Sequence, residues 1–336
     1  KSGDRLTYRI ERYPMSAPAW EAVDAEVRVA GAGAPALQWK TNRNMLATNS
    51  FATPALGVDA ELVDVGTFTA AALDKIDVRG KIVMADGRVG QLFTEAVVKR
   101  GAVGVLAYAM PAYTQPEKHR TSIVFQGIPL DTVRKSWGIA LSFDARAQLR
   151  AALAAGPTRL RVSTRVTWTP NAVERTVVAD VRGSSAPDDR FVFSAHVQEP
   201  GANDNASGVG AQVEMARVAA ELLKAGSIDP RRTITFLWGL EIRSTDRYIT
   251  QDSVRAQGIR WGLSLDMVGE DTRQTGGTFL IEKMPDPSAI WTRGEDKHTE
   301  WGGSAIGKDR LAPHYFNDFV LQRCLEQAAT NGWVVK

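Results

Sequence analysis

The sequence predicts an α/β fold in which a mostly parallel mixed sheet carries helices on both faces. Beyond Thr169, segments typical of strands and helices alternate, which is the pattern of a parallel sheet covered on both sides. The segment 233–238 is apolar or β-branched throughout, as a buried central strand is. The segment after Asn205 instead repeats apolar residues at steps of three and four, which indicates a helix.

The elements of this second half can be placed in order. Strands are expected at 175–181 and 190–195, and the second of them ends at His196. The helix that follows Asn205 is expected to stop at Gly226. Two more strands, at 233–238 and 259–267, then enclose a helix at about 245–257.

The first half predicts a smaller, separate unit, because 336 residues exceed one comfortable hydrophobic core. Residues 1–55 are expected to form an N-terminal extended segment that packs on the larger domain. Residues 56–168 are expected to form a lid-like domain, and 169–336 the main domain. Within 56–168, a βαβ-like unit is indicated by a strand at 78–86, a helix at 93–99 and a strand at 101–108, followed by a helix at 141–153 and a strand at 158–168.

Composition excludes several classes of function. The net charge is only +3 and the basic residues are scattered, so nucleic-acid binding is not expected. No apolar stretch reaches the roughly 18 to 20 residues of a membrane span. The one cysteine, Cys324, can form no disulfide within the chain and is expected to be a structural thiol. Because the chain begins at Lys1 rather than Met, a processed or trimmed product is expected.

Four side chains point to a metal site. His196 and Asp204 lie eight positions apart where a strand gives way to a helix, and Glu241 and Asp266 come at the ends of the next two strands. In open α/β sheets, ligands bind outside the carboxyl ends of the strands. One imidazole with three carboxylates suits a divalent cation, and zinc is the commonest catalytic choice.

The chemistry of such a site follows from these residue types. A carboxylate at Asp204 could bridge two metal ions that together activate one water, and a glutamate beside that water could act as general base. Asp204 could instead cap the following helix, although the adjacent Asn205 already suits capping. Asp266 is expected within an apolar strand, where an unpaired charge would cost several kcal/mol. The remaining histidines, His119, His298 and His314, are expected at the surface.

Three motifs resemble peptidase family M28, the zinc aminopeptidase-like metallopeptidases. They are Gly-Ala-Asn-Asp-Asn-Ala-Ser-Gly at 201–208, Trp-Gly-Leu-Glu at 238–241 and Leu-Asp-Met-Val-Gly at 265–269. Segments 77–83 and 101–108 resemble the protease-associated domain, a lid inserted in several peptidases. The resemblance implies a zinc-dependent peptidase, by preference an aminopeptidase, with one or two zinc ions, a peptide substrate and a secreted or periplasmic location. It also implies that His196 and Asp266 are ligands, that Asp204 bridges, and that Glu241 is the general base.

The chain departs from the family pattern at three places. Gln198 stands where the family has an aspartate that orients the histidine, and Ile242 stands where it has a second glutamate. The role of Glu241 as base or ligand is therefore open, and Glu199 is a possible substitute carboxylate. The family's last histidine ligand is missing, which indicates that the natural chain continues past Lys336. Two alternatives remain: a catalytically silent binding protein on this fold, and a metal-dependent acyltransferase or cyclase. The sequence predicts neither the substrate side chain nor the oligomeric state.

Overall fold

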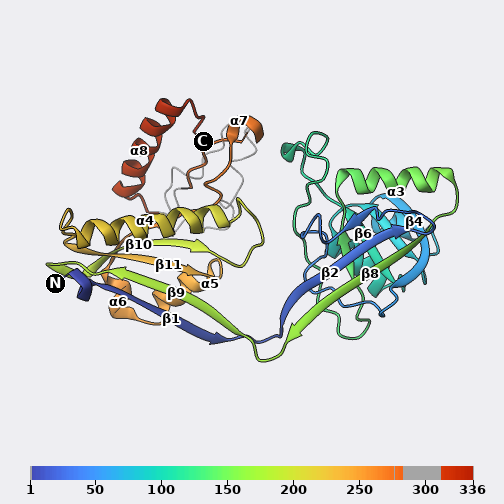
Figure 1. Cartoon of the computed structure of the whole chain (residues 1–336), viewed down its shortest axis with the longest axis horizontal. Helices are drawn as coiled ribbons and strands as arrows, with labels where there is room; N and C mark the ends of the chain where they lie inside the picture. Colours follow the sequence, from blue (N-terminus) through green and yellow to red (C-terminus); the bar gives the residue numbers. More distant parts are fainter. Residues whose placement is uncertain (1, 276, 283–311, 336) are drawn as a thin grey trace. The chain divides into compact units, whose positions relative to one another are not determined.

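The computed structural model describes residues 2–275, 277–282 and 312–335 (Figure 1). Its strands form two sheets, one of five strands in the order β1-β9-β11-β10-β12 and one of seven in the order β3-β2-β8-β4-β5-β6-β7. Both sheets contain parallel and antiparallel pairs and both carry helices, so the predicted α/β class with a mixed sheet is confirmed.

The five-stranded sheet carries the predicted motifs. Its strands are β1 (Leu6–Pro14), β9 (Val173–Val181), β10 (Ala186–His196), β11 (Arg232–Gly239) and β12 (Ile259–Ser264). Strand β10 runs parallel to both β11 and β12, whereas β9 is antiparallel to β11 and to β1. Because three neighbouring strands are parallel, their carboxyl ends meet at one edge of the sheet.

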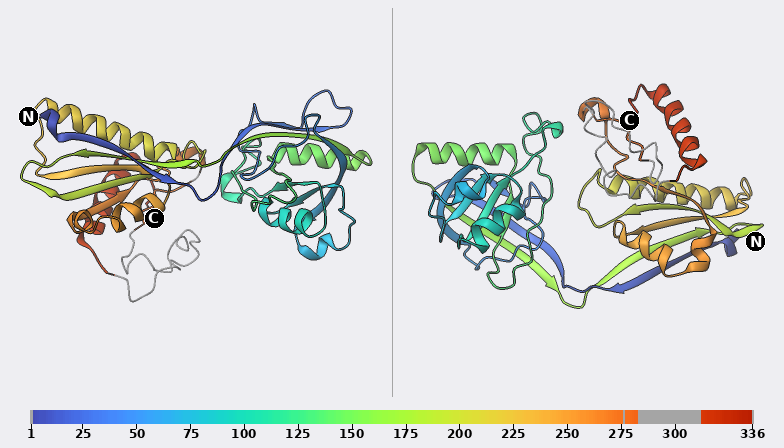
Figure 2. Two further views of the ribbon diagram at one scale, coloured as in Figure 1. Left: turned by 90° about the horizontal axis from the view of Figure 1, so that it is seen from below. Right: turned by 180° about the vertical axis from the view of Figure 1, so that it is seen from behind.

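Helices cover both faces of this sheet, with α4 (Ala206–Lys224) on one face and α5 (Arg243–Thr250) and α6 (Ser253–Gly258) on the other (Figure 2). Tyr248 of α5 is buried against Val178, Val192 and Leu237. The single helix expected at 245–257 is thus two helices. The side chain of Asp252 accepts a hydrogen bond from the amide of Arg255 and so begins the second one.

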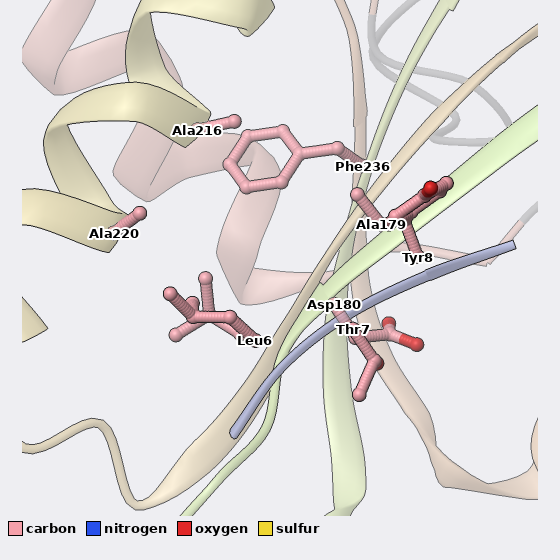
Figure 3. A pocket seen from close by; sticks show the side chains of 9 residues that line it. Leu6, Thr7, Tyr8, Ala179, Asp180, Ala216, Ala220 and Phe236 are labelled. Carbon is pink, nitrogen blue, oxygen red and sulfur yellow. The ribbon is translucent and has the colours of Figure 1, made fainter. Parts of the chain in front are cut away.

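The face beneath α4 is lined by aromatic side chains. Phe191 stacks on Phe193 with ring centres 4.3 Å apart, Phe193 on Phe236 at 5.6 Å, and Phe236 on Trp238 at 5.8 Å. Beside Phe236 a cavity of about 200 Å³ remains between α4 and the sheet (Figure 3). Two small residues of α4, Ala216 and Ala220, line it, so the helix does not fill the space above the strands.

The seven-stranded sheet contains the βαβ unit that the sequence predicts. Strands β4, β5, β6 and β7 are parallel, and α2 and η2 connect β5 to β6. Strands β2, β3 and β8 complete the sheet through antiparallel pairs. The bounds are β2 (Ala19–Val29), β3 (Leu37–Gln38), β4 (Val58–Thr67), α1 (Ala70–Leu73), β5 (Ile82–Asp86), α2 (Val89–Leu92), η2 (Phe93–Val98), β6 (Gly104–Tyr108), η3 (Ala112–Thr114), β7 (Gly138–Ala140), α3 (Phe143–Ala155) and β8 (Arg159–Thr169).

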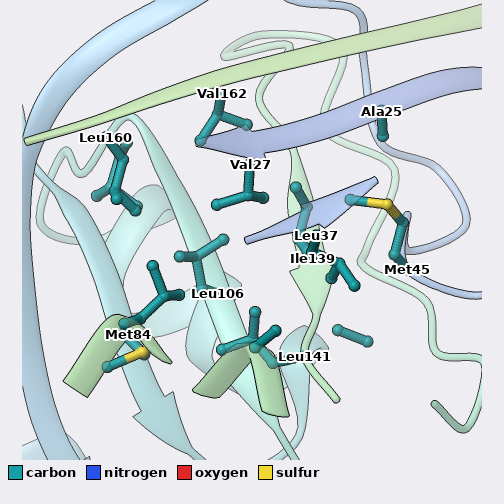
Figure 4. Close-up of a cluster of buried hydrophobic side chains, with 14 of the residues drawn as sticks. Ala25, Val27, Leu37, Met45, Met84, Leu106, Ile139, Leu141, Leu160 and Val162 are labelled. Atoms are coloured by element: carbon teal, nitrogen blue, oxygen red, sulfur yellow. The ribbon is translucent and has the colours of Figure 1, made fainter. Parts of the chain in front are cut away.

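Two buried layers hold this second sheet together, one on each of its faces. Met84 and Leu106 point to the layer that includes Leu149 of α3, and Figure 4 shows these two side chains among residues of β2 and β8. Val83 and Val105, one residue earlier in their strands, belong to the other layer with α2 and η2. The alternation along β5 and β6 is the period-two pattern of strands buried on both faces.

The N-terminal residues contribute to both sheets, since β1 belongs to the five-stranded sheet and β2 and β3 to the seven-stranded one. A short 3₁₀ turn, η1 (Ser2–Arg5), precedes β1. The division at 55/56 and 168/169, and the protease-associated character of the middle part, stay predictions.

The described residues beyond Val268 belong to a second compact unit. Its described elements are α7 (Thr272–Thr275) and α8 (Tyr315–Asn331), and Phe279 pairs with Val335 in an isolated bridge. None of the described helices is long and apolar enough to cross a membrane.

Candidate metal centre

The four predicted side chains come from the end of the sheet where the three parallel strands finish. His196 is the last residue of β10, pairs with Gly239 in the register of β11, and has a side chain only 6% exposed. Glu241 lies two residues past the end of β11 and Asp266 two residues past the end of β12. Asp204 lies in the loop that leads into α4. The sequence placed Asp266 inside its strand, which is wrong: β12 ends at Ser264, and the Asp266 side chain is 42% exposed.

Two carboxylates approach the same nitrogen of His196. Nε2 lies 3.4 Å from Oδ1 of Asp204 and 3.3 Å from Oδ2 of Asp266. In a tetrahedral zinc site with bonds of 2.0 to 2.1 Å, neighbouring ligand atoms are about 3.3 Å apart. Each of these carboxylate oxygens therefore lies as far from Nε2 as one zinc ligand atom lies from its neighbour.

Two more carboxylates lie close by. Oε2 of Glu199 lies 3.8 Å from Nδ1 of His196. One potential ligand atom each from Glu199, His196 and Asp204 lie within 4.8 Å of one another. Potential ligand atoms of Glu241, His196 and Asp266 likewise lie within 4.8 Å of one another. The described residues thus offer two overlapping sets of ligands that share one imidazole.

The site fits a cation on two further grounds. Nδ1 of His196 and Oδ1 of Asp204 are buried, and neither makes a hydrogen bond to any described residue. Burial, and next the neighbouring Asp204 carboxylate, raise the pKa of Glu199 to about 7. Buried polar atoms without partners and crowded carboxylates are both relieved by a bound divalent ion, which brings the opposite charge.

Gln198 contacts Glu241 rather than His196. Its side-chain oxygen accepts a hydrogen bond from the Glu241 amide at 2.9 Å, and its side-chain nitrogen donates to Oε2 of Glu241 at 3.4 Å. Within the described residues, Gln198 makes no hydrogen bond to the imidazole of His196. The side-chain amide of Gln198 instead binds both the backbone and the carboxylate of Glu241.

The residues that follow two of the carboxylates have unusual backbone conformations. Ile242 has φ +57° and Met267 has φ +52°, directly after Glu241 and Asp266. Such values are strained for a β-branched residue such as Ile242, and strain of this kind concentrates at functional sites. Ile242 itself is 78% exposed, so packing does not explain the apolar side chain there.

The cap that the sequence assigned to Asn205 is confirmed. Its side chain accepts a hydrogen bond from the amide of Gly208 and begins α4. The side chain of Asn205 also contacts the loop after β12, as does that of Ser207, and no local pattern predicts these contacts. The only signal for them was that both belong to the octapeptide at 201–208.

The other histidines and the single cysteine belong to other elements of the chain. His119 is half-buried in the loop before β7, and His314 caps α8, its ring nitrogen accepting from the amide of Phe316. His298 lies outside the described residues. Burial raises the pKa of the Cys324 thiol, which does not favour a nucleophilic role.

Comparison with known proteins supports the resemblance. Residues 176–292 match the family model of peptidase family M28. A zinc aminopeptidase from Bacillus subtilis is similar in structure, with a TM-score of 0.56 and 18% identity over 86% of this chain and 64% of that one. A peptidase M28 precursor from Shewanella amazonensis SB2B has a TM-score of 0.52 and 18% identity over 77% of this chain and 61% of that one.

These structural likenesses show the fold. This chain spans less than two thirds of the length of either solved structure. No curated protein matches it. The matched segment runs from β9 to beyond β12 and so contains every residue of the centre described above, which confirms the predicted resemblance to the family.

Proposed function

We propose that this chain, a member of peptidase family M28 over residues 176–292, is a zinc-dependent peptidase, and that it acts as an aminopeptidase. The observation that carries the proposal is the pair of contacts to Nε2 of His196, 3.3 and 3.4 Å long, from carboxylates of two different loops. The zinc aminopeptidase of similar fold supports the choice of metal and of reaction.

In this proposal His196, Asp204 and Asp266 hold zinc, and Glu199 stands in for the missing second glutamate. Glu199 is suited to this role because it reaches both His196 and Asp204. Zinc bound there would act as a Lewis acid that polarises a peptide carbonyl and acidifies a water.

Glu241 is proposed as the general base. Its side chain is exposed at the edge of the site, and Gln198 holds its Oε2. A carboxylate held in this way can take a proton from the attacking water and deliver it to the departing amine. Gln198 carries no charge, so it orients Glu241 without repelling it.

Zinc content and hydrolysis of aminoacyl anilides test the proposal together. We expect the protein to bind zinc and cleave these substrates, and to spare peptides whose N-terminus is acetylated. His196→Ala and Asp204→Asn should lose both properties. The matched control is Asp189→Asn in the same strand, because Asp189 pairs with Arg232 and Arg260 at the other end of the sheet. Less than about half an equivalent of zinc with no cleavage would overturn the proposal.

A catalytically silent binding protein is the second candidate. It is favoured by Ile242, an exposed apolar residue where the family has a glutamate, and by the presence of a single histidine in the metal-binding groups of the described residues. This candidate requires peptide binding without turnover. Isothermal titration with a peptide that is not hydrolysed over hours would support it against the peptidase.

The family resemblance also supports a location outside the cytoplasm, secreted or periplasmic. Fractionation of the natural host, with an antibody against the protein, tests this expectation. Recovery of the protein only with cytoplasmic markers would contradict it.

A further inference from the structure

We propose that Asn205 is a positioning residue that fixes Asp204 and Asp266 relative to each other. The inference rests on the proposed metal centre and adds a residue to it. Asn205 adjoins Asp204 in sequence, is 1% exposed, and lies between the Asp204 loop and the first turn of α4. Its side chain reaches across to the loop that follows β12.

The side-chain amide of Asn205 binds both neighbours of Asp266. Its nitrogen donates to the carbonyl oxygen of Leu265 at 3.0 Å, and its oxygen accepts from the amide of Met267 at 3.3 Å. Leu265 is also held on its other side, because its amide donates to the carbonyl of Ser194 in β10 at 3.0 Å. The backbone on either side of Asp266 is therefore tied to the residue that follows Asp204.

A second contact joins the same two loops. The hydroxyl of Ser207 accepts from the amide of Val268 at 3.0 Å and donates to the carbonyl of Asn203 at 2.6 Å. Gly208 permits the close approach, since a Cβ there would collide with the carbonyl oxygen of Leu265 and with the side chain of Asn205. Asn205, Ser207 and Gly208 together form a brace between the two loops.

Helix capping alone does not account for asparagine at this position. A cap needs one acceptor for the amide of Gly208, which serine, threonine or aspartate also supplies. The bond to the Leu265 carbonyl needs a donor as well, and only a side-chain amide offers a donor and an acceptor in this geometry. Asparagine at position 205 therefore supplies the contacts of the brace as well as the helix cap.

The brace matters because a metal ion is sensitive to the spacing of its ligands. Asp204 and Asp266 come from loops 62 residues apart (266 − 204), and both reach Nε2 of His196. Side chains that hold ligands in place change metal affinity by about 10- to 100-fold when they are removed. We therefore expect Asn205 to act on metal affinity through Asp204 and Asp266, without touching the ion.

The deciding variant is Asn205→Ser, which keeps a neutral cap but is too short to reach Leu265. We expect its zinc affinity, measured by competition with a chromophoric chelator, to fall about 10- to 100-fold. The visible spectrum of the cobalt-substituted protein should also change. Asn205→Asp keeps the acceptor contacts, loses only the donor and adds a charge, so it should alter the cobalt spectrum without loss of the helix.

Ser142→Ala is the matched control. Ser142 caps α3, which packs on the seven-stranded sheet, by accepting a hydrogen bond from the amide of Ala145. Among the residues that the structure describes, it makes no contact with the loops of the metal centre. It should lower the melting temperature and leave zinc affinity unchanged. If Asn205→Ser behaves in the same way, Asn205 is only a cap and the inference is wrong, although the metal centre stands.

Ser207→Ala keeps the inference testable if Asn205→Ser does not fold. It removes the second contact of the brace and leaves the Asn205 cap in place, so zinc affinity should fall in the same direction by a smaller factor. Unchanged affinity in this variant would contradict the brace. A native protein that binds no zinc would instead overturn the proposed function itself, and the inference with it.

Discussion

The two sheets place acidic residues at similar positions and give them different partners. In the seven-stranded sheet, Asp86 ends β5, and its carboxylate is bound by Arg146, with Nε to Oδ1 at 2.7 Å. Arg150 binds Asp64 of β4 at 2.7 Å and Asp86 at 3.2 Å. In the five-stranded sheet, no arginine or lysine of the described residues forms an ion pair with Asp204, Glu241 or Asp266.

The difference separates a structural cluster from a binding site. Arg146 and Arg150 belong to α3, so the ion pairs of the seven-stranded sheet attach that helix to the strand ends and neutralise the carboxylates within the chain. At the other sheet only one imidazole meets several carboxylates, and the negative charge is left for a ligand to neutralise. The presence or absence of arginine at the strand ends thus decides which sheet can take a cation.

Exchanging a carboxylate for its amide in each sheet should give opposite results for metal binding. We expect Asp266→Asn to weaken zinc binding by more than about 100-fold and to abolish peptide hydrolysis, because it removes a ligand. Asp86→Asn should leave both unchanged. Chelator competition and anilide hydrolysis measure the two effects, and equal zinc affinity in the two variants would remove the distinction between the sheets.

The crowded carboxylates should also make stability depend on pH. The pKa of Glu199 is raised from 4.5 to about 7 in the folded protein, so folding favours its protonated form. Its contribution to the free energy of unfolding is therefore complete below pH 4.5 and is lost as the pH rises through 7. We therefore expect the metal-free protein to become less stable across that interval. Urea denaturation at several pH values measures this loss. Glu199→Gln should flatten the profile, and a profile as steep as that of the native protein would refute the assignment.

The arginine-paired carboxylates should contribute to stability where the unpaired ones do not. Asp86→Asn is expected to lower the free energy of unfolding by about 1–3 kcal/mol, because it weakens two partly buried charged hydrogen bonds. Asp204→Asn should raise the stability of the metal-free protein, since it removes one of several like charges. Asp59→Asn, in an exposed pair with Arg159, is the control and should change it by less than about 1 kcal/mol. Losses of similar size in all three variants would contradict the comparison.

Backbone strain beside Glu241 should be measurable as a smaller effect. Ile242→Gly relieves a positive φ that costs about 1–3 kcal/mol and adds chain entropy worth about 0.5–1 kcal/mol to the unfolded state. Because Ile242 is exposed, little apolar burial is lost. We expect a net gain of about 1 kcal/mol in urea denaturation. A loss of stability would mean that the Ile242 side chain makes contacts that its exposure does not indicate.

Local patterns predicted much of the site. The strand before His196, the helix that follows Asn205, the Asn205 cap and the stop at Gly226 all depend on residues within a few positions of one another. Such features follow from periodicity and from capping chemistry, which a single sequence contains. They were sufficient to place His196, Glu241 and Asp266 at or just beyond the ends of three neighbouring strands.

Contacts between distant residues could not be predicted in this way. Gln198 meets Glu241 across 43 residues, and the partner of its amide depends on how two strands align. Asn205 and Ser207 bind the loop that follows β12 from 60 and 61 residues away, and neither contact has a local pattern. The sequence pattern of the N-terminal strands likewise does not indicate that β1 and β2 belong to two different sheets.

The pairing of β1 with β9 has a consequence for the order of folding. Pro14 lies opposite Val173, and after only four intervening residues Ala19 lies opposite Thr169. A ladder between such distant segments forms slowly when a long disordered loop must close. Once β2 and β8 have paired, however, the two chain segments are already side by side. The rate at which the first strand joins the sheet that carries the metal ligands should therefore follow the rate at which the other sheet forms.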